Sequence, residues 1–425
     1  MIHGLDAVAA GTPADRDRFM DFLRAASISV VVFGHWFIEI IWWQNGLIFT
    51  TSAIGVTSGL WLATWAFQVM PIFFFVGGFS NMVAYDAYKR RRQSTGAFIQ
   101  SRLERLLRPS LIFLAVWFVI QVTLHVTDTG SPTGFRLWDG ARLLRGMRPP
   151  AATVPFGPLW FLLVYVVVVA VSPATIWLHR RFGWWVPAIL AVATVLTDFV
   201  GFGYGLHWVR YFNVVFVLFL PHQLGHAYAD GGFARLSRRV FWTMAIGGLA
   251  ALVLLTNPWL FEALGGNSRF RWFPVIGYYP KSLLGTDVEP ISNAYPPTVC
   301  YLAVGIWTIG AVMLLRDRLT RWLRKDRPWK AVIFGNSVIM TLFLWHMTAY
   351  LIAILMLWPL GFGHQHDSTA RWWIERFVWI GAPGLVLAAI ASLVARFERP
   401  LAREAPGVLR ADRSSRAGSF GQGAR

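Results

Sequence analysis

The first strongly apolar segment of the chain, 17–40, carries the ionisable side chains Asp21, Arg24, His35 and Glu39 in its interior. The segment is long and apolar enough to predict a helix that crosses a bilayer. Ionisable groups inside such a helix are costly and face a protein interior or a watery cavity, so they indicate a functional site. His35 follows Arg24 by 11 residues. That spacing places the two side chains on one helix face, about 16 Å apart along the axis.

Glu39 is expected one helical turn beyond His35, on nearly the same face. An imidazole beside a carboxylate can act as a general base, with His35 taking a hydroxyl proton and Glu39 orienting the ring. Two other interpretations stay open. The residues can form a polar packing cluster in which Arg24 extends to the cytoplasmic interface. Alternatively, His35 and Glu39 can relay protons in a membrane transporter or flippase.

A second candidate group is the arginine triplet Arg102, Arg105 and Arg108, which recurs every third residue just before Pro109. We expect it to form a cationic stripe on a helix that leads into a membrane span. Closely spaced guanidinium groups suit bidentate phosphate binding, so the triplet is a candidate clamp for the phosphates of coenzyme A. The alternative is a basic juxtamembrane stretch that sets topology or contacts anionic lipid.

The composition indicates an all-α, polytopic integral membrane protein. Of the 425 residues, 56% are hydrophobic and only 14% are charged. A single cysteine, Cys300, excludes an intramolecular disulfide and a cysteine metal site. Apolar stretches of about 20 residues recur, which is the length that a helix needs to span a bilayer. The ten predicted spans are 19–43, 60–86, 109–127, 156–178, 184–200, 208–228, 240–258, 295–315, 331–358 and 372–396.

The formal net charge of +18 is distributed in a way that argues for membrane topology and against nucleic acid as a partner. Lys and Arg concentrate in alternate connecting segments, such as 89–108 and 316–330, and are absent from 44–59. The positive-inside rule places the basic segments and both termini in the cytoplasm. Three regions are predicted: a cytoplasmic N-terminal segment 1–18, a membrane domain 19–400, and a basic disordered tail 401–425.

The first helix resembles the signature of acyltransferase family 3, whose members are membrane-bound enzymes that acylate saccharides, glycolipids or macrolides. The similarity covers the stretch RFMDFLRAASISVVVFGHW and includes the spacing between Arg24 and His35. The arginine triplet that ends before Pro109 resembles the second motif of the family. Weaker similarity extends over nearly the whole chain.

Three further stretches resemble the family less specifically. Gly77 and Gly78 stand where the family has a small-residue break in its second span, although two glycines also permit helix packing. Trp160, in the Trp-Phe-Leu sequence 160–162, is predicted to contact substrate or to anchor an interfacial aromatic belt. His346, in a late span, is likewise predicted to contact substrate, and its alternative is a purely structural histidine.

The resemblance implies an integral membrane O-acyltransferase that takes an acyl group, expected to be acetyl, from cytoplasmic acyl-CoA. The acceptor would be a hydroxyl of a saccharide, glycolipid or polyketide-type molecule at the inner cell membrane, with membrane lipid as a partner and a homo-oligomer as an option. Catalytic roles would fall to Arg24, His35 and Glu39, and donor binding to the arginine triplet. No metal is expected, because His222 and His226 have zinc-like spacing without a third ligand, so we expect them to be solvated at the interface.

Overall fold

The computed structural model of the chain describes residues 6, 9–13, 16–44, 47–126, 156–259, 277–285 and 291–403. Across these residues the fold is almost entirely helical, which confirms the all-α membrane class predicted from composition. The elements are, in chain order, α2 (Arg18–Ile38), β1 (Glu39–Gln44), β2 (Leu47–Ser52), α3 (Ala53–Val56), α4 (Trp61–Phe67), α5 (Met70–Arg90), α6 (Thr95–Val126), α8 (Leu159–Phe182), α9 (Trp185–Gly203), η1 (His207–Phe212), α10 (Asn213–Ala229), η2 (Gly232–Arg235), α11 (Arg238–Leu255), α14 (Val299–Trp322), α15 (Asp326–Ser337), α16 (Ile339–Leu357), η3 (Trp358–Leu360) and α17 (Ala370–Arg403).

The first long helix, α2, begins where the Asp17 side chain accepts a hydrogen bond of 3.1 Å from a backbone amide of the first turn. Such a cap satisfies one of the amides that a helix start leaves unpaired. The helix ends at Ile38, and Glu39 opens β1 in an extended conformation, opposite Ser52 of β2. The predicted span 19–43 is therefore too long, because the β-branched and aromatic residues after Glu39 pair with β2 instead of continuing the helix.

Nine helices within the described residues are long and apolar enough to cross a membrane. The predicted span 208–228 differs, because it divides into the short η1 and α10, and α10 has 17 residues with Pro221 inside it. Most side chains of α10 are buried, since this helix packs against α5, α8 and α9. Among the described residues, the ten predicted spans therefore correspond to nine helices of spanning length and one shorter, buried helix.

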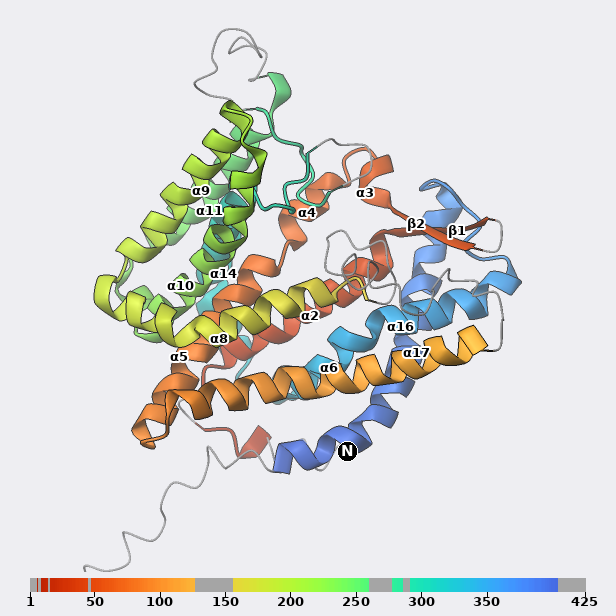
Figure 1. Cartoon of the computed structure of the whole chain (residues 1–425), viewed down its shortest axis with the longest axis horizontal. Coiled ribbons are helices and arrows are strands. Elements are labelled where there is room, and N and C mark those ends of the chain that lie inside the picture. The colour runs from red at the N-terminus through yellow and green to blue at the C-terminus, as the bar shows by residue number, and fades with distance from the viewer. Residues whose placement is uncertain are drawn as a thin grey trace, which may run out of the picture.

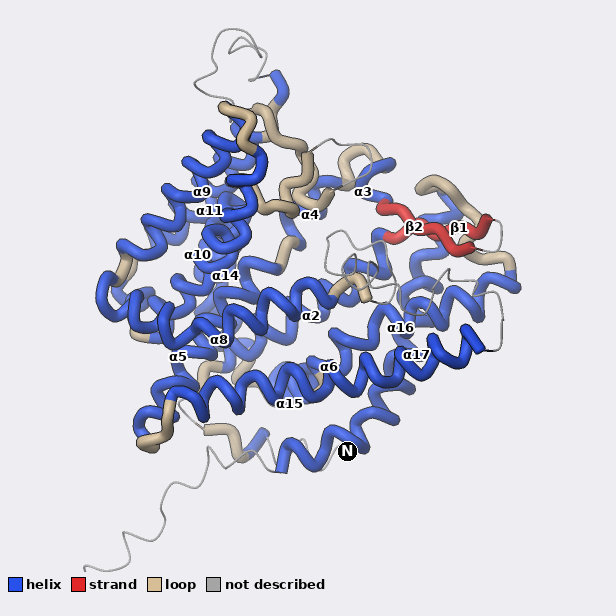
Figure 2. Tube along the Cα trace, in the orientation of Figure 1, coloured by secondary structure: helices blue, strands red, loops and turns tan. Residues whose placement is uncertain are grey.

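Two large hydrophobic clusters form most of the core, and α2 contributes to both. The amino-terminal half of α2 packs with α5, α10, α11 and α14, whereas its carboxyl-terminal half packs with α6, α8, α16 and α17. In Figure 1, α9, α10, α11 and α14 gather on one side of α2, and α6, α16 and α17 lie on the other. The short β1–β2 hairpin lies at the edge of this second group (Figure 2). The first helix thus joins the two halves of the core.

Glycine allows α5 and α10 to cross at unusually close range. A Cβ atom at Gly78 would lie 1.9 Å from the backbone oxygen of His222, and one at Gly225 would lie 2.1 Å from that of Phe75. No larger residue fits at either position without movement of a backbone. Of the two interpretations of the Gly77-Gly78 pair, helix packing therefore describes Gly78.

Polar contacts gather the ends of α2, α10 and α14 at one end of the bundle. The Tyr228 hydroxyl donates to the Asp17 carboxylate at 2.7 Å and accepts from Arg316 Nε at 2.8 Å. Arg18 Nη1 donates to the Leu323 carbonyl at 2.9 Å. Segments predicted to be cytoplasmic therefore meet at a common end, while the side of the membrane that this end faces stays a prediction.

Two segments of the sequence lie wholly or mostly beyond the described part of the chain, one between α6 and α8 and the other the predicted tail. The connecting segment 128–155 lies outside the described residues, as do residues 404–425 of the predicted tail. The last helix, α17, continues to Arg403, slightly past the predicted domain end at residue 400.

Candidate active site

His35, in the last turn of α2, lies beside His346 of α16. The Nδ1 atom of His35 is 3.0 Å from Nε2 of His346, and the two rings are stacked with their centroids 5.2 Å apart. His346 is fully buried, whereas His35 is partly exposed. His346 was predicted to contact substrate, and the structure brings it directly against the predicted base.

The hydrogen bonds of His346 fix which nitrogen of each neutral ring carries the proton. Nδ1 of His346 is 2.7 Å from the Phe343 carbonyl, and a carbonyl only accepts, so this Nδ1 is protonated. Nε2 of neutral His346 is then an acceptor, and His35 Nδ1–H donates to it. The remaining nitrogen, His35 Nε2, keeps its lone pair, and no described residue is hydrogen-bonded to it. His35 is therefore held with one open proton-accepting nitrogen.

A tryptophan fixes the register between α2 and α16 at this point. Trp36 is 1% exposed, and its indole Nε1 donates to the His346 carbonyl at 3.1 Å. Two residues after His346, the Thr348 hydroxyl accepts from the Trp117 indole of α6 at 3.0 Å. The bond from Trp36, the residue after His35, to the backbone of His346 holds the two histidines against each other.

Glu39 is the C-cap residue of α2, directly after Ile38, so the helix on which it was predicted to follow His35 ends at this position. The chain turns from helix to strand at Glu39. Its carbonyl, together with those of Trp36 and Phe37, accepts from Nη1 of Arg376 at 3.0–3.3 Å. Among the described residues, the hydrogen-bonding partner of His35 is an imidazole and not a carboxylate.

Glu375 and Arg376 of α17 are site neighbours that the sequence analysis missed. Both are buried, with 5% and 4% of their surfaces exposed. Glu375 accepts from Arg371 at 2.7 Å, and the Arg376 guanidinium lies 4.0 Å from the Trp372 ring centroid. The sequence did contain a signal for Glu375 and Arg376. Adjacent charged residues inside the predicted span 372–396 are as unusual as the ionisable residues inside the first span.

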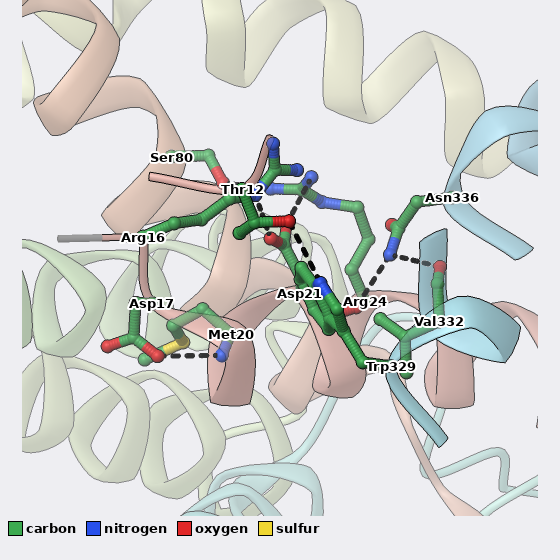
Figure 3. Close-up of polar contacts among 10 residues, drawn as sticks. All are labelled: Thr12, Arg16, Asp17, Met20, Asp21, Arg24, Ser80, Trp329, Val332 and Asn336. Atoms are coloured by element: carbon green, nitrogen blue, oxygen red, sulfur yellow. Dashed lines mark hydrogen bonds and ion pairs between the residues drawn. The ribbon is translucent and has the colours of Figure 1, made fainter. Parts of the chain in front are cut away.

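Arg24 lies near the opposite end of α2, in a separate polar cluster (Figure 3). Its guanidinium donates to the Asp21 carboxylate at 3.4 Å and to the Ser80 hydroxyl of α5. Arg16 donates to the other Asp21 oxygen at 2.6 Å, and Asn336 of α15 holds the Asp21 backbone carbonyl at 2.9 Å. Two cations share one carboxylate, so this cluster keeps a positive charge.

Arg102 of α6 extends the positive cluster around Arg24. Its Nη2 donates to the Asn81 side-chain oxygen at 2.8 Å, and it interacts electrostatically with both Arg24 and Arg105. Asn81 belongs to the same helix as Ser80, the partner of Arg24. The structure therefore brings the first arginine of the triplet to the arginine of the first helix.

The triplet does not form the predicted continuous stripe. Arg105 and Arg108 are exposed, and Arg108 lines a surface groove with apolar residues of α6 such as Leu107 and Leu111. The reason is helical geometry, since a step of three residues turns the helix by about 60° short of a full turn. Arg102 and Arg108 consequently point about 120° apart, one into the bundle and one outward.

Two aromatic rings separate Trp160 from the histidine pair. The Trp160 ring centroid is 6.2 Å from that of Phe161, which in turn is 5.7 Å from Phe343. The Phe343 ring centroid is 6.3 Å from that of His346. The Trp-Phe-Leu sequence thus supports the pair through aromatic packing.

His222 and His226 are buried at 0% exposure, so the prediction that they are solvated at the interface is wrong. They lie inside because α10 crosses α5 closely, and His226 Nδ1 donates to the Gly78 carbonyl at 3.0 Å. His179 is a buried neighbour whose ring centroid is 5.9 Å from that of His226. In the part of the chain that the structure describes, no group of three His, Cys, Asp or Glu side chains is arranged to hold a metal ion.

Comparison with known families matches residues 17–397 to the family described as Acyltransferase domain, acyltransferase family 3. The matched range includes both histidines of the pair and the arginine cluster. Comparisons with curated proteins and with solved structures return no match. The family match favours an enzyme over the transporter alternative. Because the match covers nearly all of the chain, and nine described helices are of membrane-spanning length, the chain belongs to acyltransferase family 3 and is a membrane acyltransferase.

Proposed function

We propose that this enzyme transfers an acyl group, acetyl in the simplest case, from acyl-CoA to a hydroxyl of a membrane-associated acceptor, with His35 as the general base. The acceptor class is a saccharide, glycolipid or polyketide-type molecule, and the location is the inner cell membrane. The observation that carries the proposal is the open Nε2 of His35, which its bond to His346 leaves ready to accept a proton.

The spacing along α2 supports acyl-CoA as the donor. Arg24 and His35 are separated by about 16 Å of helix, with cations at one end and a base at the other. Acyl-CoA has the matching form, because its phosphates and its thioester lie at opposite ends of a long pantetheine arm. In this proposal Arg24, Arg102 and Arg105 bind the phosphates, since guanidinium groups suit phosphate oxygens. Arg108 is left out, because it points away from the cluster.

The proposed reaction is direct transfer. The acceptor oxygen attacks the thioester carbonyl carbon while its proton passes to Nε2 of His35. The carbon–sulfur bond then breaks, and the proton passes from His35 to the departing sulfur. The products are an ester and the free thiol of CoA. A general base placed in this way contributes about 10²- to 10⁴-fold to the rate.

His346 serves in this scheme as the positioning partner that Glu39 was predicted to be. Its acceptor nitrogen selects the tautomer of His35 that has a free Nε2, which is the role of a carboxylate in a catalytic triad. A neutral imidazole stabilises the imidazolium less than a carboxylate does. It also brings no negative charge that would trap the proton on His35.

The test uses isolated membranes that contain the wild-type chain or the His35→Ala variant at equal amounts. Isotope-labelled acetyl-CoA is added, and label is followed into a lipid or saccharide fraction from which mild alkali releases it, as expected for an ester. Wild-type membranes should form this ester and release free CoA, and the variant should not. Equal labelling in both samples, or no labelled ester with the wild type, would overturn the proposal.

A further inference from the structure

Asn81 lies between Arg102 and a buried histidine, and it bonds to both. The Asn81 side-chain oxygen accepts from Arg102 Nη2 at 2.8 Å, and its amide nitrogen is 3.3 Å from Nε2 of His222. Asn81 and His222 are each 0% exposed. Three helices, α5, α6 and α10, thus meet in one short chain of hydrogen bonds.

The direction of each bond is forced by chemistry. A guanidinium has only donors, so the oxygen of Asn81 must face Arg102 and its nitrogen must face His222. His222 Nε2 therefore accepts, and the proton of the neutral ring is on Nδ1. That Nδ1 has no hydrogen-bond partner among the described residues, so the bond to Asn81 is what orients the ring.

The chain is set up by the helix crossing between α5 and α10. Gly78 lies directly against the His222 backbone, and Asn81 is one turn further along the same face of α5. The backbone contact at Gly78 therefore places the His222 side chain beside Asn81. The distance between these two side chains depends on a glycine that cannot be enlarged.

Arg102 is partly buried, and its hydrogen-bonding partner is a neutral amide. Arg24 in the same cluster faces the carboxylate of Asp21, whereas Arg102 forms no ion pair among the described residues. An amide oxygen orients a guanidinium without cancelling its charge. The remaining donors of Arg102 and its full positive charge are thus left for an anion.

We propose that Asn81 and His222 are positioning residues for the donor, which hold Arg102 in place so that it meets a phosphate of acyl-CoA with its charge intact. The inference rests on the proposed donor site and adds two residues to it. The inference explains why residue 81 is a buried asparagine. An aspartate there would bind Arg102 more strongly but would cancel its positive charge.

The test compares the steady-state kinetics of Asn81→Asp with those of the wild type, using acetyl-CoA and S-acetylpantetheine as donors. Asn81→Asp keeps the acceptor for Arg102 but adds a negative charge. The KM for acetyl-CoA should rise by about 10- to 100-fold, which corresponds to the loss of one charge-assisted contact with phosphate. The kcat should change little. With S-acetylpantetheine, which lacks the nucleotide phosphates, the two enzymes should have the same KM.

His222 supplies a second, independent comparison. The side-chain oxygen of His222→Gln can accept from Asn81 as Nε2 does, whereas His222→Leu cannot. The KM for acetyl-CoA should therefore be raised in the leucine variant and restored toward wild type in the glutamine variant. Asn213→Ala removes another fully buried asparagine, bonded to Asp198, and should lower the unfolding temperature without raising that KM.

Two outcomes would overturn the inference. One is a wild-type KM for acetyl-CoA in Asn81→Asp while Arg102→Ala raises it, because the donor site would then be right and the positioning pair wrong. The other is an equal rise of KM for both donors in Asn81→Asp, which would indicate general damage. A wild-type KM in Arg102→Ala would overturn the donor site itself, and absence of acyl transfer by the wild type would overturn the proposed function.

Discussion

The guanidinium of Arg376, on the last described helix, holds the backbone carbonyl of Glu39 at the end of the first, with a hydrogen bond of 3.0 Å. The same nitrogen reaches the carbonyls of Trp36 and Phe37. A helix leaves its last carbonyls without partners, and a cation is favoured there by the helix dipole. Arg376 is therefore a C-terminal cap for the turn of α2 that contains His35.

Replacement of Arg376 by leucine should lower both stability and turnover. It leaves buried carbonyls unsatisfied, which costs about 1–3 kcal/mol in the free energy of unfolding. It also frees the turn of His35, so kcat should fall while the KM for the donor, whose phosphates are bound at the other end of α2, stays the same. Thermal unfolding in detergent and steady-state kinetics measure the two effects.

Arg318→Leu is the matched control, in which an exposed arginine is replaced in the same way. Arg318 lies on α14. Surface substitutions of this kind change the free energy of unfolding by about 0.5 kcal/mol or less, so this variant should stay close to wild type in both measurements. Equal effects of the two substitutions would contradict the capping role of Arg376.

Replacement of His35 by alanine should reduce kcat by about 10²- to 10⁴-fold and leave the affinity for CoA nearly unchanged. His346→Gln retains an acceptor at the position of Nε2, so it should keep more activity than His346→Leu, which has none. His364→Ala is the control, because this exposed histidine stacks on Trp358 in the loop before α17. Near wild-type transfer by His35→Ala would place the base elsewhere.

The first helix shows what a single sequence can and cannot predict. The positions of Arg24 and His35 on one helix follow from a local period, and the structure places both on α2. The end of that helix does not follow, because an Ile-Ile-Trp-Trp run suits a membrane helix and a hairpin strand equally well. The choice is made by pairing with β2, which hydropathy does not encode.

Contacts between helices were beyond the sequence analysis for the same reason. His35 and His346 are 311 residues apart, and Asn81 and His222 are 141 apart. Periodicity assigns a residue to a face of its own helix but does not state which helix covers that face. The charge of Arg376 was the available clue, since ionisable residues inside spans tend to face one another.

Replacement of Gly78 by alanine should destabilise the fold. The new Cβ would lie 1.9 Å from the His222 carbonyl oxygen, so α5 and α10 must separate. Overpacking of this kind costs about 1–3 kcal/mol and occasionally more. Gly247→Ala in α11 is the control, because nothing lies within 4 Å of its Cβ position and alanine favours a helix. Equal unfolding temperatures for the two variants would contradict the close crossing.

The predicted orientation can be tested by labelling single cysteines in a Cys300→Ala background. Ser58 and Arg327 are both exposed, and they belong to segments predicted to lie outside and inside the cell. A reagent that does not cross membranes should modify Ser58→Cys in intact cells and should reach Arg327→Cys only after lysis. Labelling of Arg327→Cys in intact cells would reverse the orientation, and with it the cytoplasmic entry of the donor.

The arginine cluster predicts a difference between two members of one triplet. Arg102→Ala should raise the KM for acetyl-CoA by about one to two decades, because a charge-assisted phosphate contact contributes about 1.5–3 kcal/mol. Arg108→Ala should leave this KM unchanged, since Arg108 lies on the outward side of α6. Both variants lose the same charge from the same helix, so a general electrostatic effect would shift both values equally. Equal shifts would assign the triplet to topology or lipid contact, whereas a shift confined to Arg102 would assign its charge to the donor.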